Sequence, residues 1–267
     1  MQKVAIITGG SSGIGKALVL KYTREGYAVA FTGRNKARMK DMEEALNEKG
    51  HSYLALSLDA ASEKDNATLV EQTMDKYGRI DVIICNAGIS MRALFQDLDL
   101  KVFKQLMDIN FYGTIYLVKY ALPHLLASKG SIIGISSING WRSTPARTAY
   151  SSSKFAMQGF FEALRTEVMA QGVHVLVVCP GFTESNIRNV ALTADGQSQG
   201  ESPRNEKKMM TSEEVASKTY RAQMRKKRDL ILTFQGKMAV FLNKIIPSRL
   251  DKMVYNLMKK EPDSPLK

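Results

Sequence analysis

Cysteine, histidine and long apolar runs are scarce in this chain of 267 residues. Its two cysteines, Cys85 and Cys179, are too few for a disulfide framework, and its three histidines are scattered without metal-ligand spacing. No stretch approaches the ~20 consecutive apolar residues that a membrane-spanning helix needs. A strand-like run begins by Lys3 and leaves no room for a signal peptide. We therefore expect a cytoplasmic protein without a metal site.

The positive charge is concentrated near the C-terminus. The chain has 38 lysines and arginines against 26 acidic residues, a net charge of +12. Residues 218–260 hold 12 of these basic residues and only Asp229 and Asp251, so this segment alone carries +10. Such a charge suits nucleic acid, an anionic membrane or an acidic ligand. The basic run at residues 225–228 lacks interleaved aromatics, so we expect a solvated turn there and no nucleic-acid partner.

Short strand-like runs alternate with longer helical patterns along most of the chain. The runs are apolar on both faces, which is typical of a parallel sheet covered by helices on both sides. We predict a single doubly wound, Rossmann-type α/β sheet, and a closed β/α barrel is the alternative. The expected strands cover residues 4–8, 28–32, 53–58, 80–85, 131–136, 173–179 and 230–233. The expected helices cover residues 13–25, 35–49, 63–77, 100–126, 149–170 and 212–225.

The first predicted strand runs directly into a glycine-rich turn that is followed by a helix. Gly9, Gly13 and Gly15 give the spacing GxxxGxG, which permits a tight turn and close approach of backbone N–H groups to a pyrophosphate. The free N–H groups and the dipole of the following helix also favour an anion. A glycine-rich turn without a ligand is the alternative. The residues expected to bind a dinucleotide here are Gly9, Ser11, Ser12, Gly13, Ile14 and Gly15.

The end of the second predicted strand indicates which dinucleotide binds. A site selective for NAD usually has an acidic residue there, which accepts hydrogen bonds from the ribose hydroxyls. Here the strand is followed by Gly33, Arg34 and Asn35 with no carboxylate, and the Arg34 guanidinium can bind a 2′-phosphate through two hydrogen bonds. We therefore expect NADP(H) as the cofactor, and a solvent-exposed arginine at a helix start is the alternative.

A tyrosine and a lysine stand one helical turn apart at the start of the longest predicted helix, in the pattern Tyr150-Ser-Ser-Ser-Lys154. Ser137 precedes the tyrosine by thirteen residues, and Asn86-Ala-Gly88 follows the fourth predicted strand. Together with the glycine turn, this order and spacing over residues 3–235 resembles the short-chain dehydrogenase/reductase family.

The resemblance implies a role for each matching residue. Tyr150 matches the catalytic acid/base, Lys154 would lower the pKa of that tyrosine, and Ser137 would hydrogen-bond the reacting oxygen. Asn110, near which we expect a break in its helix, matches an asparagine that holds a water of the proton relay. An exposed Tyr–Lys pair and a turn-forming serine are the structural alternative. The resemblance also implies cofactor contacts from Asp59, Asn86, Gly88, Tyr150, Lys154, Pro180, Gly181, Thr183 and Ser185.

Two regions interrupt the alternation of strands and helices. Residues 182–211 have little periodicity and follow a strand end, so we predict a substrate lid there. Within it, residues 192–196, like residues 86–90, are similar to the dehydrogenase/reductase family member 7 type. We thus expect a dinucleotide-binding catalytic domain over residues 1–235 and a basic helical extension over residues 236–267.

The expected reaction is hydride transfer between a nicotinamide and a carbonyl or alcohol carbon, with carbonyl reduction favoured because cellular NADPH is usually kept reduced. Large apolar side chains around the predicted site favour an apolar or lipid-like ketone, and Arg92 and Arg142 are candidates to meet an anionic group. Packing of these residues in the core is the alternative. The predicted substrate residues are Met91, Phe95, Trp141 and Phe182.

The C-terminal extension has two apolar stripes at helical spacing, separated by Pro247. Lysines and arginines lie mostly off the stripes, as in helices at a membrane surface. Ser248 and Asp251 indicate a capping box at the start of the second helix. We favour packing of both helices on the body or on a second subunit, with peripheral membrane contact through residues 236–260 as the alternative. The stripes are Met238, Phe241, Leu242, Ile245 and Ile246, and then Leu250, Met253, Val254, Leu257 and Met258.

Three functions fit these observations. An NADPH-dependent reductase of a small-molecule carbonyl is favoured, because the set Ser137, Tyr150, Lys154 and Asn110 is intact. A 3-oxoacyl-carrier-protein reductase, whose basic surface would meet an acidic carrier, is the alternative. A non-catalytic NADPH-binding sensor or scaffold is a second alternative. The resemblance also implies a homodimer or homotetramer, paired through the helices matching residues 110–128 and 149–170.

Overall fold

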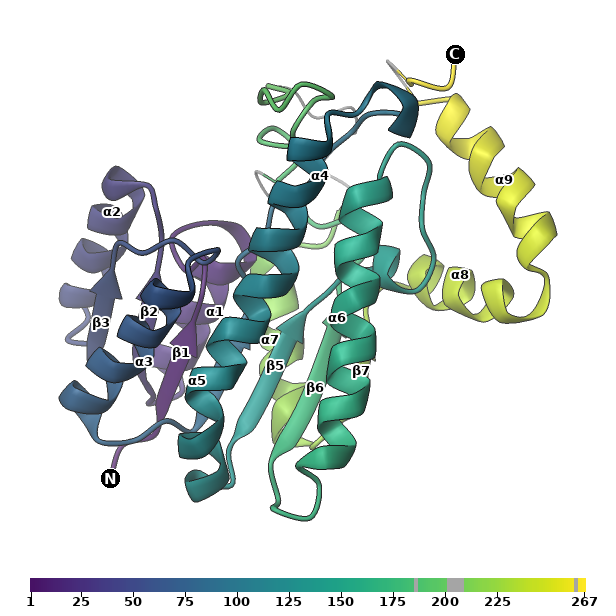
Figure 1. The fold of residues 1–267 in the computed structure, drawn as a ribbon. Helices are drawn as coiled ribbons and strands as arrows, with labels where there is room; N and C mark the ends of the chain where they lie inside the picture. The colour runs from purple at the N-terminus through teal and green to yellow at the C-terminus, as the bar shows by residue number, and fades with distance from the viewer. Residues whose placement is uncertain (185–186, 201–208, 262–263) are drawn as a thin grey trace.

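The computed structural model describes residues 1–184, 187–200, 209–261 and 264–267. These residues form a seven-stranded sheet in the order β3-β2-β1-β4-β5-β6-β7, with every neighbouring pair parallel (Figure 1). The order is that of an open sheet, so the predicted doubly wound fold is confirmed and the barrel is excluded. The strands are β1 (Val4–Ile7), β2 (Ala28–Thr32), β3 (Tyr53–Leu56), β4 (Val82–Cys85), β5 (Ser131–Ile135), β6 (His174–Cys179) and β7 (Asp229–Ile231).

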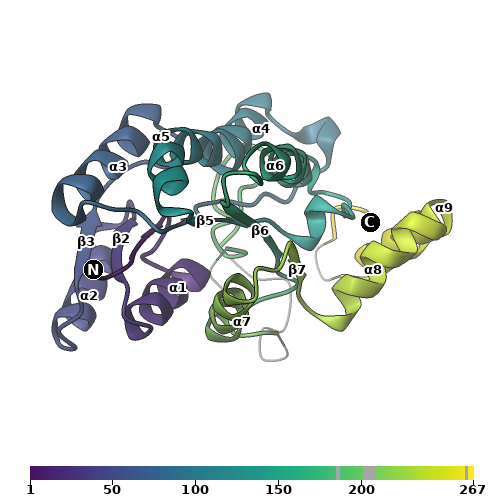
Figure 2. The ribbon, with the colours of Figure 1, turned by 90° about the horizontal axis from the view of Figure 1, so that it is seen from below.

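Helices cover both faces of the sheet, as Figure 2 shows. One face packs against α1, α2 and α7 through side chains such as Leu18 and Val215. The other packs against α3, α5 and α6 through side chains such as Leu117 and Phe161. The helices are α1 (Gly13–Arg24), α2 (Lys36–Asn47), α3 (Glu63–Tyr77), α4 (Leu100–Met107), α5 (Gly113–Ser128), α6 (Thr148–Glu167), α7 (Ser212–Met224), α8 (Phe234–Ile245) and α9 (Pro247–Lys259).

The strand order reverses between β1 and β4, which are neighbours in the sheet. In doubly wound sheets the loops at such a point diverge and leave a crevice at the carboxyl ends of the strands. Asn86 fastens the two loops to each other, because its Nδ2 donates to Thr8 O at 2.9 Å and to Gly9 O at 3.2 Å. The Thr8 hydroxyl accepts in return from the backbone N–H groups of Asn86 and Ala87.

The helix predicted over residues 100–126 is interrupted at the expected place. α4 ends at Met107, residues Asp108–Tyr112 form one π-helical turn, and α5 continues from Gly113. A π turn inside a helix redirects its side chains and is frequent at functional sites. Here it carries the fully buried Asn110.

The C-terminal extension forms the two predicted helices, α8 and α9, at the β7 end of the sheet (Figures 1 and 2). The last strand ends at Ile231 and not at residue 233. Thr233 instead caps α8, since its hydroxyl accepts a hydrogen bond from Gly236 N at 3.1 Å. Helix α8 therefore begins at Phe234.

The capping box predicted at the start of α9 is not formed. The helix begins at Pro247, one residue before Ser248, and proline suits the first position of a helix because no N–H is required there. The Asp251 carboxylate forms an ion pair with Arg142 at 2.8 Å instead of capping the helix.

The described part of the predicted lid lies against the loop after β4. Leu192 N donates to Ser90 O at 2.8 Å, and Arg92 N donates to Leu192 O at 2.9 Å. Residues 185–186 and 201–208 of this segment lie outside the described residues. Across the described ranges, none of the helices combines the length and apolar character needed to cross a bilayer.

Candidate active site

A cavity of about 1040 Å³ opens at the carboxyl ends of the strands. Its walls come from the glycine turn, from the loops after β2 to β6, and from α8 and α9. Every described residue that we predicted to contact the cofactor lines it, whereas Ser185 lies outside the described residues. Those lining residues are Gly9, Ser11, Ser12, Gly13, Ile14, Gly15, Arg34, Asp59, Asn86, Gly88, Tyr150, Lys154, Pro180, Gly181 and Thr183.

The glycine turn presents bare backbone to the cavity. Gly9 (φ +66°) and Gly13 (φ +50°) adopt left-handed conformations, and a Cβ on Gly15 would meet Gly9 O at 2.0 Å. Ser12, the N-cap residue of α1, makes no side-chain cap, and the first turn of α1 contains no acidic residue. The N–H donors of this helix end are therefore available to an anion, and the turn fits a pyrophosphate.

Two arginines lie where the loop after β2 meets α2. Arg34 and Arg38 both line the cavity, both are exposed, and neither has an ion-pair partner among the described residues. The Asn35 side chain caps α2 by accepting a hydrogen bond from Arg38 N at 3.0 Å. Asp59, after β3, lines the same cavity while its carboxylate accepts from Ala61 N at 3.0 Å. Two unpaired guanidinium groups here fit a phosphate.

Tyr150 projects from the first turn of α6 and lines the cavity together with Ser137. Burial raises the pKa of Tyr150 above its ordinary value, while a hydrogen bond with Ser137 and the positive charge of Arg147 lower this pKa. Ser137 is also the N-cap of the short turn that follows β5, since its hydroxyl accepts from Asn139 N at 3.1 Å. The serine thus orients a turn and faces the cavity at the same time.

Lys154 lies one helical turn after Tyr150, and only 4% of it is exposed. Its Nζ donates to Ile135 O at 2.9 Å and lies 5.9 Å from the centroid of the Tyr150 ring. Burial lowers the pKa of this amine to about 8. The predicted lowering of the Tyr150 pKa by the positive charge of Lys154 stays a prediction.

Asn110 holds the loop after β4 and does not line the cavity. Its Oδ1 accepts from Ile89 N at 2.8 Å, and its Nδ2 donates to Ile89 O at 3.0 Å and to Ser153 Oγ at 2.9 Å. A Cβ on Gly88 would lie 3.1 Å from Asn110 Oδ1 and 3.6 Å from Lys154 Nζ. Asn110 therefore ties this loop to α6 beside the lysine, and its place in a water relay stays a prediction.

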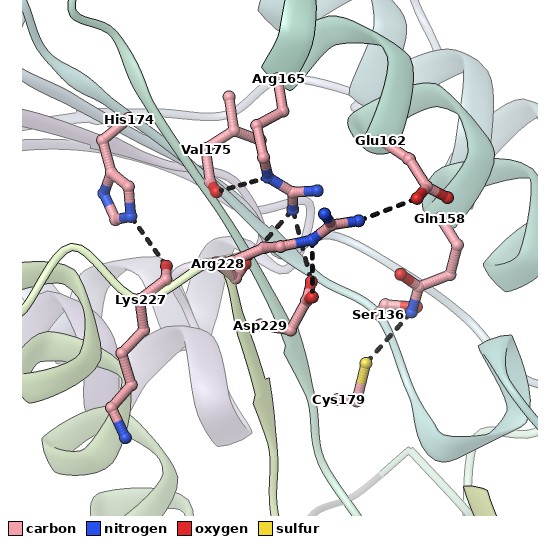
Figure 3. A network of polar contacts seen from close by, with 10 residues as sticks. All are labelled: Ser136, Gln158, Glu162, Arg165, His174, Val175, Cys179, Lys227, Arg228 and Asp229. Carbon is pink, nitrogen blue, oxygen red and sulfur yellow. Dashed lines mark hydrogen bonds and ion pairs between the residues drawn. The ribbon is translucent and has the colours of Figure 1, made fainter. Parts of the chain in front are cut away.

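A polar network fastens α6 to the sheet next to the site (Figure 3). Gln158, one turn after the buried lysine, donates to Ser136 Oγ at 3.3 Å and to Cys179 Sγ at 3.1 Å. Further along the helix, Arg165 pairs with Asp229 at 3.3 Å. These contacts fix α6 against β5, β6 and β7, and so they fix the position of Tyr150 as well.

Of the four predicted substrate residues, Phe182 lines the cavity, whereas Met91, Phe95 and Trp141 do not. Met91 forms a β-bridge with Leu192. The Met91 side chain is buried in a small core cluster, whereas Leu192 lines the cavity. Phe95 is exposed on a 3₁₀ turn away from the cavity. Trp141 packs against the core cluster that includes α6.

Three contributions to the site escape the sequence analysis. Arg38 stands four residues after Arg34, and this helical spacing is the signal that could have identified it. Arg147 donates to Ser90 Oγ at 2.9 Å and also bonds Met91 O, so that it holds the loop after β4 near Tyr150. The third contribution comes from the inner faces of α8 and α9. The sequence did not reveal it, because an apolar stripe has the same residue pattern whether it faces a core or a cavity.

The chain is similar in sequence and in fold to known proteins. The short chain dehydrogenase family profile matches residues 3–195. The chain is 33% identical to "Dehydrogenase/reductase SDR family member 7B" of Mus musculus, over 98% of this chain and 83% of that protein. It is 34% identical to "11-beta-hydroxysteroid dehydrogenase A" of Sesamum indicum, over 69% of this chain and 53% of that protein. A crystal structure of a short-chain dehydrogenase from Streptomyces avermitilis has a TM-score of 0.82 at 23% identity, over 97% and 98% of the two chains.

An open parallel sheet with a glycine turn at its switch point and a Ser–Tyr–Lys set in the same cavity defines a nucleotide-binding oxidoreductase fold. The chain belongs to the short-chain dehydrogenase/reductase family. Its similarity to the member 7B protein over nearly its whole length confirms the predicted resemblance to the member 7 type.

The Gly15→Ala variant is expected to lose dinucleotide binding, because the added methyl group would meet Gly9 O at 2.0 Å and force the turn open. Calorimetric titration with NADPH should show an affinity lowered by about a hundredfold or more. Gly159→Ala is the matched control, since a Cβ at this exposed position on α6 meets nothing within 4 Å. Native affinity in a folded Gly15→Ala variant would refute the assignment of the turn.

Proposed function

We propose that this protein is an NADPH-dependent carbonyl reductase and alcohol dehydrogenase of the short-chain type, acting on an apolar or lipid-like ketone. The observation that carries the proposal is a shared cavity. Ser137, Tyr150 and Lys154 line the same space as the glycine turn, and apolar side chains such as Leu242 and Val254 line another part of it. A dinucleotide and an apolar ketone can therefore meet at Tyr150.

In the proposed mechanism Tyr150 is the proton donor. NADPH, when bound, would supply the hydride to the carbonyl carbon. Ser137 and Tyr150 share a hydrogen bond and line the cavity, so both hydroxyls can polarise a carbonyl oxygen held there. As negative charge develops on that oxygen, Tyr150 transfers its phenolic proton to it and the alcohol forms. The raised pKa of Tyr150 keeps the phenol protonated before this step, and Lys154 would hold the cofactor ribose.

The preference for NADPH over NADH rests on the two exposed arginines beside the cavity. Arg34 and Arg38 have no ion-pair partner among the described residues, and the loop between β2 and α2 offers no carboxylate to the ribose. Both guanidinium groups are thus available to a 2′-phosphate.

The apolar lining of the cavity guides the choice of substrates to test. A relative named for 11-beta-hydroxysteroid oxidation makes steroid ketones a rational first probe. A 3-oxoacyl-carrier-protein reductase is the alternative, and an acyl-thioester ketone in the panel tests it. The apolar walls that α8 and α9 add to the cavity favour a free apolar ketone over a carrier-bound one. A non-catalytic NADPH-binding sensor is the second alternative.

Tyr150→Phe is expected to lower kcat by at least about a hundredfold, because the proton donor is lost, while NADPH affinity stays within about twofold. NADPH oxidation is followed with a panel of steroid, long-chain and acyl-thioester ketones. Tyr77→Phe is the matched control, since the buried Tyr77 hydroxyl lies outside the cavity. Undiminished turnover in Tyr150→Phe would overturn the mechanism. NADPH binding without turnover of any ketone by the native protein would favour the sensor.

Arg34→Asp is expected to shift the ratio of kcat/KM for NADPH to that for NADH by about a hundredfold toward NADH, because a carboxylate repels the 2′-phosphate and accepts from ribose hydroxyls. Steady-state kinetics with both cofactors measure this ratio. Lys36→Asp changes the charge by the same amount two residues away, outside the cavity, and should leave the ratio nearly unchanged. An unaltered ratio in Arg34→Asp would remove Arg34 from cofactor selection.

We propose in addition that the protein is cytoplasmic and contacts anionic membranes through α8. Phe241 and Ile245 stand one turn apart on this helix, and both are exposed and outside the cavity lining. The helix lies within the segment 218–260, whose net charge is +10. Exposed apolar side chains flanked by lysines are the pattern of helices that lie in a membrane interface.

In a flotation assay the native protein is expected to rise with vesicles containing phosphatidylserine and to remain behind with pure phosphatidylcholine vesicles. Phe241→Ser/Ile245→Ser should reduce flotation more than tenfold, since each large apolar side chain contributes about 2 kcal/mol on burial. Met169→Ser, at an exposed position past the end of α6, is the control and should float like the native protein. If the native protein does not float with anionic vesicles, the proposed membrane contact through α8 is wrong.

The homodimer or homotetramer implied by the family resemblance stays a proposal. Tyr112 at the start of α5 and Phe155 on α6 are large, apolar and exposed on the face that would pair. Their exposure supports an interface between copies of the chain along these helices.

A further inference from the structure

The second stripe of the extension faces the catalytic cavity. Helix α9 presents its apolar side to the space that Tyr150 lines, so the extension belongs to the site as well as to the surface. Its cavity-lining residues are Leu250, Met253, Val254, Leu257 and Met258.

Most of this apolar face is not covered by protein. Of the residues of α9 only Leu250 is buried, whereas Met253 is 56% and Leu257 is 63% exposed. An apolar helix face normally packs against a core, since removing large apolar side chains from water is favourable. Here that face looks into the cavity, so an apolar ligand in the cavity is what would cover it.

Ion pairs hold α9 in this position. Asp251 in its first turns pairs with Arg142 at 2.8 Å, and Glu261, just past its end, pairs with Arg92 at 3.5 Å. We call these two pairs the clasp. Arg92 and Arg142 are the two arginines that the sequence analysis names as candidates to meet an anionic group. In the structure each of them pairs with a carboxylate of the chain itself. Both partners of the Arg92–Glu261 pair are largely buried, which strengthens this pair relative to an exposed one. In the other pair Arg142 is largely buried, whereas the Asp251 side chain is 66% exposed and solvent screens the attraction.

The clasp connects α9 to the loops that carry the catalytic residues. Arg142 lies in the segment between Ser137 and Tyr150, and it lines the cavity itself. Arg92 lies in the loop after β4, which Asn110 ties to α6. The position of the apolar wall is thereby set relative to the reacting carbonyl.

We propose that α9, held by the clasp, is the specificity-determining wall for an elongated apolar group on the ketone. From Leu250 to Met258 the wall runs for roughly 12 Å, the rise of eight residues of α-helix. The ketone end lies at Tyr150 and the apolar tail lies along α9. This inference rests on the proposed reductase function, because that function defines which end of the substrate lies at Tyr150.

The first test is a series of methyl ketones from 2-butanone to 2-dodecanone. Leu257→Asn should raise KM for the longest ketones about tenfold, leave kcat nearly unchanged, and leave 2-butanone unaffected. Leu257 is exposed, so the substitution spares the fold. Tyr255→Asn is the matched control on the same helix, because Tyr255 lies outside the catalytic cavity, and its KM values should stay native. An equal effect of Leu257→Asn on short and long ketones, or no effect, would overturn the proposal.

The second test addresses the clasp. Asp251→Ala and Arg142→Ala should each raise KM for long ketones, and the exchanged pair Arg142→Asp/Asp251→Arg should restore the native value. Failure of both single variants to affect long ketones would remove the clasp from the proposal. An exchanged pair that folds but stays as impaired as the single variants would show that the charges do not act as a pair.

Calorimetric binding of 2-dodecanone separates this inference from the proposed function. If the native protein binds 2-dodecanone, Leu257→Asn binds it about tenfold more weakly, and neither protein oxidises NADPH with it, then the reductase function fails while the wall stands. If turnover is native but binding is insensitive to Leu257→Asn, the wall fails alone.

Discussion

The burial of one lysine amine constrains the whole site. Lys154 is held at the carboxyl end of β5 by its bond to Ile135 O, and burial lowers its pKa to about 8. The unfolded chain therefore binds more protons than the folded one between about pH 8 and 10.5, and folding stability rises with pH through this range. Below it, charging the buried amine costs stability that the packing of α6 must offset. Two contacts hold α6 close to the sheet. Gln158 donates a hydrogen bond to Cys179 Sγ, and the Phe161 ring packs against Gly134, which has no side chain.

Fixing α6 also fixes what surrounds it. Asn110 on the π turn and Arg147 before α6 both anchor the loop after β4, so this loop, the tyrosine and the lysine are positioned together. The same loop pairs with the described part of the lid and, through Arg92, with the C-terminal extension. The cofactor side of the cavity depends on backbone geometry, whereas the substrate side depends on side chains of the extension. This division fits a family in which one cofactor chemistry serves many substrates.

The sequence predicts the cofactor side far better than the substrate side, for a physical reason. The glycine turn, Tyr150 and Lys154 are defined by local spacing within one strand–turn–helix unit or one helix turn. Met91 and Trp141 are apolar residues in loops, and only the tertiary pairing with Leu192 and the packing beneath α6 decide that they face the core. The depressed pKa of the lysine likewise follows from burial, which spacing does not reveal.

The central role of the buried amine can be measured through the pKa of Lys154. Lysine labelled with ¹³C at Cε reports the protonation of each amine by NMR, and Lys154→Arg assigns the signal of interest. In the protein without added cofactor, we expect this amine to titrate near 8. A titration near 10.5, the ordinary value for an exposed lysine, would show that the amine is solvated and that burial of Lys154 does not organise the site.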